Sequence, residues 1–174
     1  MDHRVLHPRL CEIAVPPCTA GAARMVAIDF ETAGMARATP CAIGVAWIEG
    51  GVVARRAYRL IRPDCADRAW CFGHIHGLYP ADVAGAARFP EIWEELAPHL
   101  DGALVLAHNA AFDLGVLRGC LELYGLETPR MRCLCTLVTA RRVWPGMPSY
   151  RLPLVAERVG SLGPEGYVSS VRAR

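Results

Sequence analysis

Residues 25–32 read Met-Val-Ala-Ile-Asp-Phe-Glu-Thr, and this stretch decides the fold. The apolar run at its start predicts a buried β-strand, which ends in two carboxylates one residue apart, Asp29 and Glu31. Alternate side chains of a strand point to the same face, so both carboxylates are expected on one side of the sheet. Two such carboxylates suit a hard divalent cation such as Mg²⁺ or Mn²⁺, whereas a strand followed by a polar turn is the alternative for Asp-x-Glu taken alone.

A second apolar strand ends in a polar cluster further along the chain. Residues 104–113 read Leu-Val-Leu-Ala-His-Asn-Ala-Ala-Phe-Asp, and a helical pattern of apolar residues begins within the cluster. His108, Asn109 and Asp113 therefore lie between the end of a strand and the first turn of a helix. Asn109 is the only Asn in the chain, so its position in this cluster is hard to dismiss as accidental.

On these residues the chain resembles the DnaQ-like exonucleases, the DEDDh group that includes the proofreading epsilon subunit of bacterial replicative polymerases. Asp29 and Glu31 match the first motif of that family. His108, Asn109 and Asp113 match its second motif. Both motifs stand in the order and at the spacing that the family shows.

Shorter matches extend the resemblance from about residue 25 to residue 160. Residues 75–78 resemble the family's Ile-His-Gly-Ile segment, and residues 134–136 and 149–160 resemble the stretch that leads to its third motif. The resemblance implies an α/β domain with the ribonuclease H-like fold. In that fold a mixed five-stranded sheet has the order 3-2-1-4-5, strand 2 runs antiparallel, and helices flank the sheet; here the C-terminal helix is expected to be truncated.

Hydrophobic periodicity and turn residues predict the individual elements. Strands are expected at 25–30, 41–48, 52–61, 103–107 and 131–135, and helices at 80–87, 91–100, 111–124, 136–143 and 149–159. Gly50 and Gly51 predict a hairpin between the second and third strands. Gly125 is expected to end the helix 111–124, and Ser149 to cap the last one.

The same patterns divide the chain into three parts. Residues 1–24 lack periodicity and are interpreted as a poorly ordered extension, which is not native if translation begins at Met25. Residues 25–160 form the exonuclease domain, and residues 161–174 an irregular tail.

The resemblance implies a two-metal-ion site that hydrolyses phosphodiester bonds. Its expected ligands are Asp29, Glu31 and Asp113, with Mg²⁺ or Mn²⁺ as the cofactor. The expected substrate contacts are Phe30, Thr32, His76, His108 and Asn109. Phe30 has a core position as its alternative, and His76 a structural position in a loop. His99, at a helix end, is interpreted as a partner of the helix dipole.

The chain departs from the family at the third motif, a His followed five residues later by an Asp. No His follows His108, no Asp follows Asp113, and Glu165 is the only carboxylate of residues 161–174. Absence of the general base implies an impaired activity, lower by on the order of 10²–10⁴ in rate. A non-catalytic module that binds nucleic acid or protein and a truncated gene product are the alternatives.

A shortened last helix also predicts an open apolar patch on the sheet. Val26, Ile28 and Val105 or their neighbours are expected to be partly exposed there, and self-association or binding of a partner through this face follows. The resemblance further implies a single-stranded DNA 3′ end as the substrate, with RNA as the alternative, and a DNA polymerase subunit as a partner.

Composition sets the remaining bounds. The 174 residues are 53% hydrophobic and 21% charged, which is typical of one globular domain. A net charge of +2 gives no general cationic field. The eight Cys show no zinc-binding spacing, and neither a secretory signal nor a membrane-spanning run is present, so reduced thiols in the cytoplasm are expected.

Overall fold

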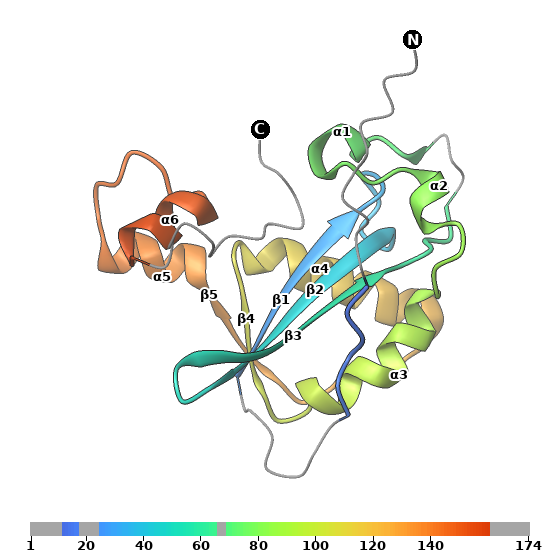
Figure 1. Ribbon diagram of the computed structural model, residues 1–174, viewed down its shortest axis with the longest axis horizontal. Coiled ribbons are helices and arrows are strands. Elements are labelled where there is room, and N and C mark those ends of the chain that lie inside the picture. The colour runs from blue at the N-terminus through green and yellow to red at the C-terminus, as the bar shows by residue number, and fades with distance from the viewer. Residues whose placement is uncertain (1–11, 18–24, 66–68, 161–174) are drawn as a thin grey trace.

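A computed structural model describes residues 12–17, 25–65 and 69–160, and a five-stranded sheet forms its centre (Figure 1). The strands are β1 (Met25–Thr32), β2 (Pro40–Glu49), β3 (Val52–Leu60), β4 (Leu104–Ala107) and β5 (Arg132–Cys135). Their order is β3-β2-β1-β4-β5. Strand β2 pairs antiparallel with β1 and β3, whereas β1, β4 and β5 run parallel. The mixed sheet and its order are confirmed.

A two-residue turn joins β2 to β3. Gly50 and Gly51 have φ values of 58° and 84°, in the left-handed region that a type I′ hairpin requires at both central positions. The hairpin that the sequence predicts at this point is therefore present. Because the hairpin fixes the register of β3 against β2, it also fixes which β3 side chains share a face with Asp29.

Six helices complete the described residues. They are α1 (Gly73–His76), α2 (Pro80–Val83), α3 (Phe89–Leu100), α4 (Ala110–Tyr124), α5 (Thr136–Val143) and α6 (Leu152–Arg158). Helix α4 ends at Gly125, which adopts the left-handed conformation expected of its cap. The sequence did not indicate α1, and α2 is shorter than the helix predicted at 80–87.

Helix α6 starts later than predicted. Its cap is Arg151 rather than Ser149, because the helix takes Pro153 into its first turn, where a missing N–H costs nothing. The Ser149 hydroxyl instead accepts a hydrogen bond from the Arg151 N–H at 3.4 Å, before the helix begins. Residues 161–174, and with them the predicted irregular tail, lie outside the described residues.

Helices α3 and α4 cover one face of the sheet and form the main core with it. Val26, Ile28 and Val105 belong to this core and are at most 4% exposed, so these three residues do not form the predicted open patch. The reason is the alternation of β1. Its even-numbered side chains face α3 and α4, whereas the neighbours Met25 and Ala27 are partly exposed on the other face. Self-association through that face of the sheet stays a prediction.

Residues 12–17, called the N-terminal segment below, pack along the free edge of β3 (Figure 1). Ile13 and Tyr58 exchange two backbone hydrogen bonds of 2.9 and 3.0 Å. The Glu12 carboxylate accepts hydrogen bonds from the Leu60 N–H and from the Arg59 side chain. This part of residues 1–24 is therefore ordered against the sheet, in contrast to the expectation, while residues 1–11 and 18–24 lie outside the described residues.

In the described part of the chain, no helix has the length and apolar character needed to cross a lipid bilayer.

Candidate active site

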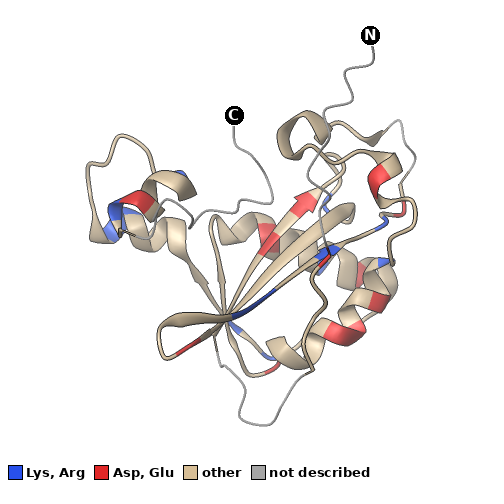
Figure 2. Cartoon of the chain, viewed as in Figure 1, with Lys and Arg blue, Asp and Glu red and all other residues tan. Residues whose placement is uncertain are grey.

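Strand β1 presents Asp29 and Glu31 on the face of the sheet opposite the main core. Their neighbours Ile28 and Phe30 point into the core, so the alternation expected from the sequence is present. Asp29 is exposed and Glu31 half-buried. Figure 2 shows acidic residues at the end of β1 and on the adjacent part of α4, away from the arginines of β3.

Asp113 of α4 joins this pair through the backbone. It is 1% exposed, and its Oδ1 accepts a hydrogen bond of 2.9 Å from the N–H of Phe30. Phe30 stands between Asp29 and Glu31, so this bond fixes the Asp113 carboxylate next to both. A helix that begins directly after β4 brings its first turn to the carboxyl end of the neighbouring strand β1, which explains the contact.

Burial raises the pKa of all three carboxyls, and repulsion between the carboxylates adds to the shift at Glu31 and Asp113. Burial, followed by the charges of Asp29 and Asp113, raises the pKa of Glu31 to about 8. Burial also raises the pKa of Asp113 to about 7, although the Phe30 N–H opposes the shift. Packed protein atoms raise the pKa of Asp29, and the nearby charge of His108 opposes this. Asp29 remains open to solvent, so its ionised form costs less than that of Glu31.

These residues fit a hard divalent cation by their chemistry. All three supply oxygen ligands, and a bound cation would relieve the repulsion that, after burial, helps to raise the pKa values of Glu31 and Asp113. Among the described residues no three His, Cys, Asp or Glu side chains already stand close enough to hold an ion. The metal role of Asp29, Glu31 and Asp113 therefore stays a prediction.

Glu31→Gln is expected to stabilise the metal-free chain at alkaline pH. A carboxyl whose folded pKa is raised holds more protons in the folded than in the unfolded state, so stability falls as the pH rises from about 4.5 towards about 8. The amide removes this loss. We expect a gain of about 1–2 kcal/mol at pH 9 and little change at pH 4, less than the full shift implies because Glu31 keeps some solvent contact.

Urea unfolding in EDTA at pH 4 and pH 9 measures this difference. The control is Glu94→Gln, because Glu94 is an exposed carboxylate of α3. An equal gain at pH 4, or a gain in the control, would contradict the electrostatic origin.

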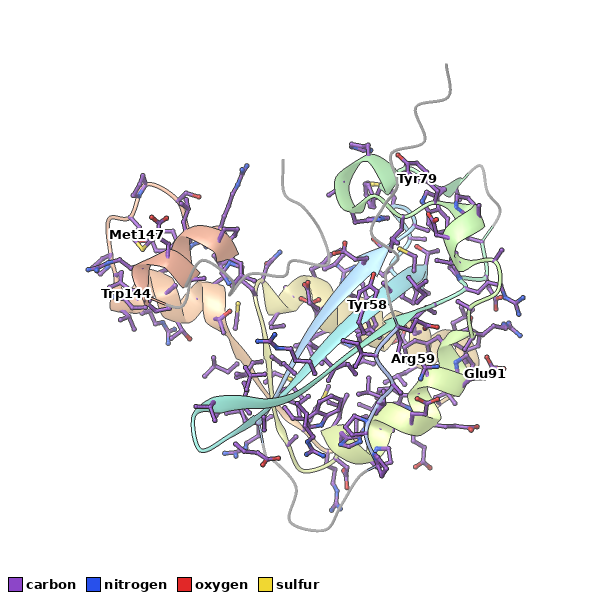
Figure 3. The ribbon with its side chains drawn as sticks, viewed as in Figure 1. Tyr58, Arg59, Tyr79, Glu91, Trp144 and Met147 are labelled. Carbon is purple, nitrogen blue, oxygen red and sulfur yellow. The ribbon has the colours of Figure 1, made fainter. Side chains whose placement is uncertain are left out.

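His108 connects the site to the segment before α6. Its Nδ1 lies 3.0 Å from the hydroxyl of Thr136, and its Nε2 lies 2.8 Å from the carbonyl oxygen of Tyr150. The Tyr150 hydroxyl in turn donates to the carbonyl of Trp144 at 2.8 Å and closes the loop between α5 and α6 (Figure 3). His108 thus binds this loop, and its charge acts on Asp29. The sequence patterns did not single out Thr136, although a Thr at the start of a helix that follows a strand was a usable signal.

Asn109 caps α4 in the left-handed conformation, with φ 71° and ψ 50°. It is the only non-glycine residue with positive φ among the described residues. Asn accepts this conformation more readily than other side chains, so a backbone requirement explains the sole Asn of the chain. Its predicted contact with substrate is untested.

His76 has a structural position rather than a free ring. Its Nε2 lies 3.0 Å from the carbonyl oxygen of Thr32, and its Nδ1 accepts the N–H of Leu78 at 3.1 Å. Burial lowers its pKa, which favours this neutral form. Both nitrogens are thus occupied by backbone, and His76 links the end of β1 to the turn after α1. Neither nitrogen is left for substrate in this arrangement, so the structural alternative describes His76 better.

Phe30 and Thr32 are also buried. Phe30 is 2% exposed and belongs to the main core, on the face away from Asp29 and Glu31. The side chain therefore has the core position named as its alternative, and its stacking on a terminal nucleotide stays an untested prediction. Thr32 is 4% exposed at the end of β1. The sequence placed both near the site along the chain but did not resolve on which face each side chain lies.

Comparison with known proteins identifies a family that the chain matches. The RNase_T family model, described as exonuclease, matches residues 26–162. The 3′-5′ exonuclease DinG of Bacillus subtilis is 31% identical over 139 residues, which are 78% of this chain and 15% of DinG. DNA polymerase III subunit epsilon of Escherichia coli is 29% identical over 135 residues, 71% of this chain and 55% of epsilon. The chain spans little more than half the length of epsilon, and far less of DinG.

Solved structures agree with the fold. Exonuclease X in complex with 5′ overhanging duplex DNA superimposes with a TM-score of 0.63 at 23% identity, over 83% of this chain and 80% of that one. The nuclease domain of 3′hExo, a DEDDh family member bound to rAMP, gives a TM-score of 0.62 at 14% identity, over 80% of each chain. At such identities the likeness shows the fold alone.

Proposed function

Because this chain belongs to the exonuclease family whose model matches residues 26–162, we propose that it is a 3′–5′ exonuclease-type domain for hydrolysis of phosphodiester bonds at DNA 3′ ends. The observation that carries the proposal is the hydrogen bond from the Phe30 N–H to Asp113, which fixes a carboxylate of α4 beside Asp29 and Glu31. Three carboxylates with raised or coupled pKa values at one edge of a sheet are typical of a cation-dependent active site.

Asp29, Glu31 and Asp113 would hold Mg²⁺ or Mn²⁺, which would supply an activated water and stabilise the charge on the departing oxygen. The protein itself holds the ligands and the neighbouring loop in position. The Phe30 N–H orients Asp113, and His108, whose charge acts on Asp29, binds the loop before α6. We propose His108 and Asn109 as residues near the substrate, since both lie at the junction of β4 and α4 beside the carboxylates.

The proposed activity of these 174 residues is weak. No His follows His108 in the sequence, and both ring nitrogens of His76 are bound to backbone, so neither replaces the general base of the family's third motif. Loss of such a base lowers the rate by on the order of 10²–10⁴. Single-stranded DNA is the proposed substrate with RNA as the alternative, and a polymerase partner is proposed from the epsilon relative.

The test is digestion of a 3′-labelled single strand, as DNA and as RNA, with Mg²⁺ and with Mn²⁺. We expect slow release of nucleotides from the 3′ end, faster with Mn²⁺, that Asp29→Asn abolishes and Glu94→Gln leaves unchanged. Strand binding without any cleavage would favour a non-catalytic binding module. Rapid Mg²⁺-dependent digestion that requires Asp29 would show that another residue completes the site.

A further inference from the structure

The hydroxyl of Tyr58 is the one buried polar side-chain atom without a hydrogen-bond partner among the described residues. Tyr58 is 8% exposed, and the hydroxyl oxygen itself exposes less than 1 Å². An unpartnered buried hydroxyl costs about 1–3 kcal/mol, so native proteins seldom retain one without a use. Tyr58 lies on β3, the edge strand along which the N-terminal segment packs (Figure 3).

The register of the sheet turns this side chain towards the carboxylates. Asp29 in β1 pairs with Gly44 in β2, and Gly44 pairs with Tyr58 in β3, so Asp29 and Tyr58 point to the same face. Glu31 shares that face and pairs with Ala42. Between Tyr58 and the carboxylates, β2 presents only Gly44 and Ala42 on this face. These small residues leave room for one long side chain to reach across two strand spacings, about 10 Å, from β3 to β1.

Glu31 is the acceptor that fits this hydroxyl. Because the oxygen has no solvent contact, a nucleotide cannot reach it as the site stands, and its partner must come from the protein. After burial, the charge of Glu31 is the largest cause of the raised pKa of Tyr58, ahead of Cys41, Glu12 and Asp29. Cys41 is a poor alternative, because burial raises the pKa of its thiol to about 12 and leaves it uncharged.

We propose that Tyr58 is a positioning residue, whose hydroxyl donates a hydrogen bond to the Glu31 carboxylate when a divalent cation is bound and so orients that carboxylate as a ligand. The inference depends on the proposed function, since it assumes that Glu31 binds the cation. A partner of this kind raises affinity without touching the metal, and its loss weakens binding by about 10-fold.

The experiment compares Tyr58→Phe with Tyr124→Phe in the full chain. Mn²⁺ affinity is measured by electron paramagnetic resonance of the free ion, and stability by urea unfolding in EDTA. Tyr58→Phe is expected to weaken Mn²⁺ binding by about 10-fold and to leave metal-free stability unchanged or slightly higher. Tyr124→Phe should instead lower metal-free stability and leave Mn²⁺ binding unchanged, because its hydroxyl donates to Asp64 at 2.9 Å at the opposite end of α4 from Asp113.

Glu31→Gln separates the two proposals. If Glu31→Gln binds Mn²⁺ as tightly as the unmodified chain, the proposed cation site is wrong. If Glu31→Gln loses affinity but Tyr58→Phe does not, only the role of Tyr58 is wrong. A loss of metal-free stability in Tyr58→Phe equal to that in Tyr124→Phe also overturns it, because the hydroxyl would then have a structural partner.

Discussion

Replacing Asp113 by Ala is expected to abolish Mn²⁺ binding and to destabilise the fold at the same time. The Phe30 N–H is buried and has the Asp113 Oδ1 as its acceptor, so truncation leaves a donor unsatisfied and opens a void beneath β1. Each effect costs on the order of 1–3 kcal/mol, and together they lower the free energy of unfolding by about 2–4 kcal/mol. Chemical denaturation in EDTA and Mn²⁺ titration measure the two losses.

Asp113→Asn separates the structural role of Asp113 from its proposed role as a metal ligand. The amide oxygen still accepts the hydrogen bond of the Phe30 N–H, so metal-free stability should be retained. Above pH 7 stability should rise slightly, because the amide does not ionise, whereas the carboxyl with its pKa of about 7 loses stability when it does. The missing charge should nevertheless weaken Mn²⁺ binding by at least about 10-fold. If Asn restored affinity as well as stability, Asp113 would be a structural residue and not a ligand.

His99→Leu is expected to produce the second large loss, about 2–4 kcal/mol of unfolding free energy. His99 is 5% exposed, its Nδ1 accepts the indole N–H of Trp47 at 3.0 Å, and its Nε2 donates to the carbonyl of Pro16 at 2.8 Å. Leucine fills much of the volume but leaves both polar partners unpaired. Replacing Trp47 by Phe in the same chain removes one orphaned group and should recover part of the loss.

The effect should also depend on pH. Burial lowers the pKa of His99, so the folded state keeps the ring neutral, and this stability is present above about pH 6.5 and lost as the pH falls through the lowered folded pKa. The difference between His99→Leu and the unmodified chain should therefore shrink between pH 7.5 and pH 5.5. A difference independent of pH would mean that the ring contributes by packing alone.

Local patterns predicted much of the sheet. The apolar run before Asp29, the Gly50-Gly51 turn and the left-handed cap at Gly125 each reflect a rule that acts over a few residues, and all are present in the structure. The strand order came from the resemblance, since strand pairing joins residues far apart in the chain. Placement of Asp29 and Glu31 on one face followed from the two-residue period of a strand.

The sequence could not predict long-range pairing of individual side chains. His99 was interpreted as a charged partner of the helix dipole, which is wrong because a buried ring with Trp47 and Pro16 as partners is neutral. His76 and Phe30 stand beside the site in sequence, but backbone carbonyls and the face of β1 decide what they contact. The register that places Tyr58 on the same face of the sheet as Glu31 depends on the pairing of β2 with both β1 and β3.

The N-terminal segment also constrains how the molecule is synthesised. Pro16 is made before His99, the residue 83 positions later whose imidazole binds the Pro16 carbonyl. Ile13 of the same segment likewise pairs with Tyr58, which is made later. At about 5–20 residues per second, the ribosome needs roughly 4–17 s to cover that distance. The N-terminal segment thus leaves the exit tunnel before the elements that bind it, and a nascent chain carries this segment unattached until β3 and α3 have folded.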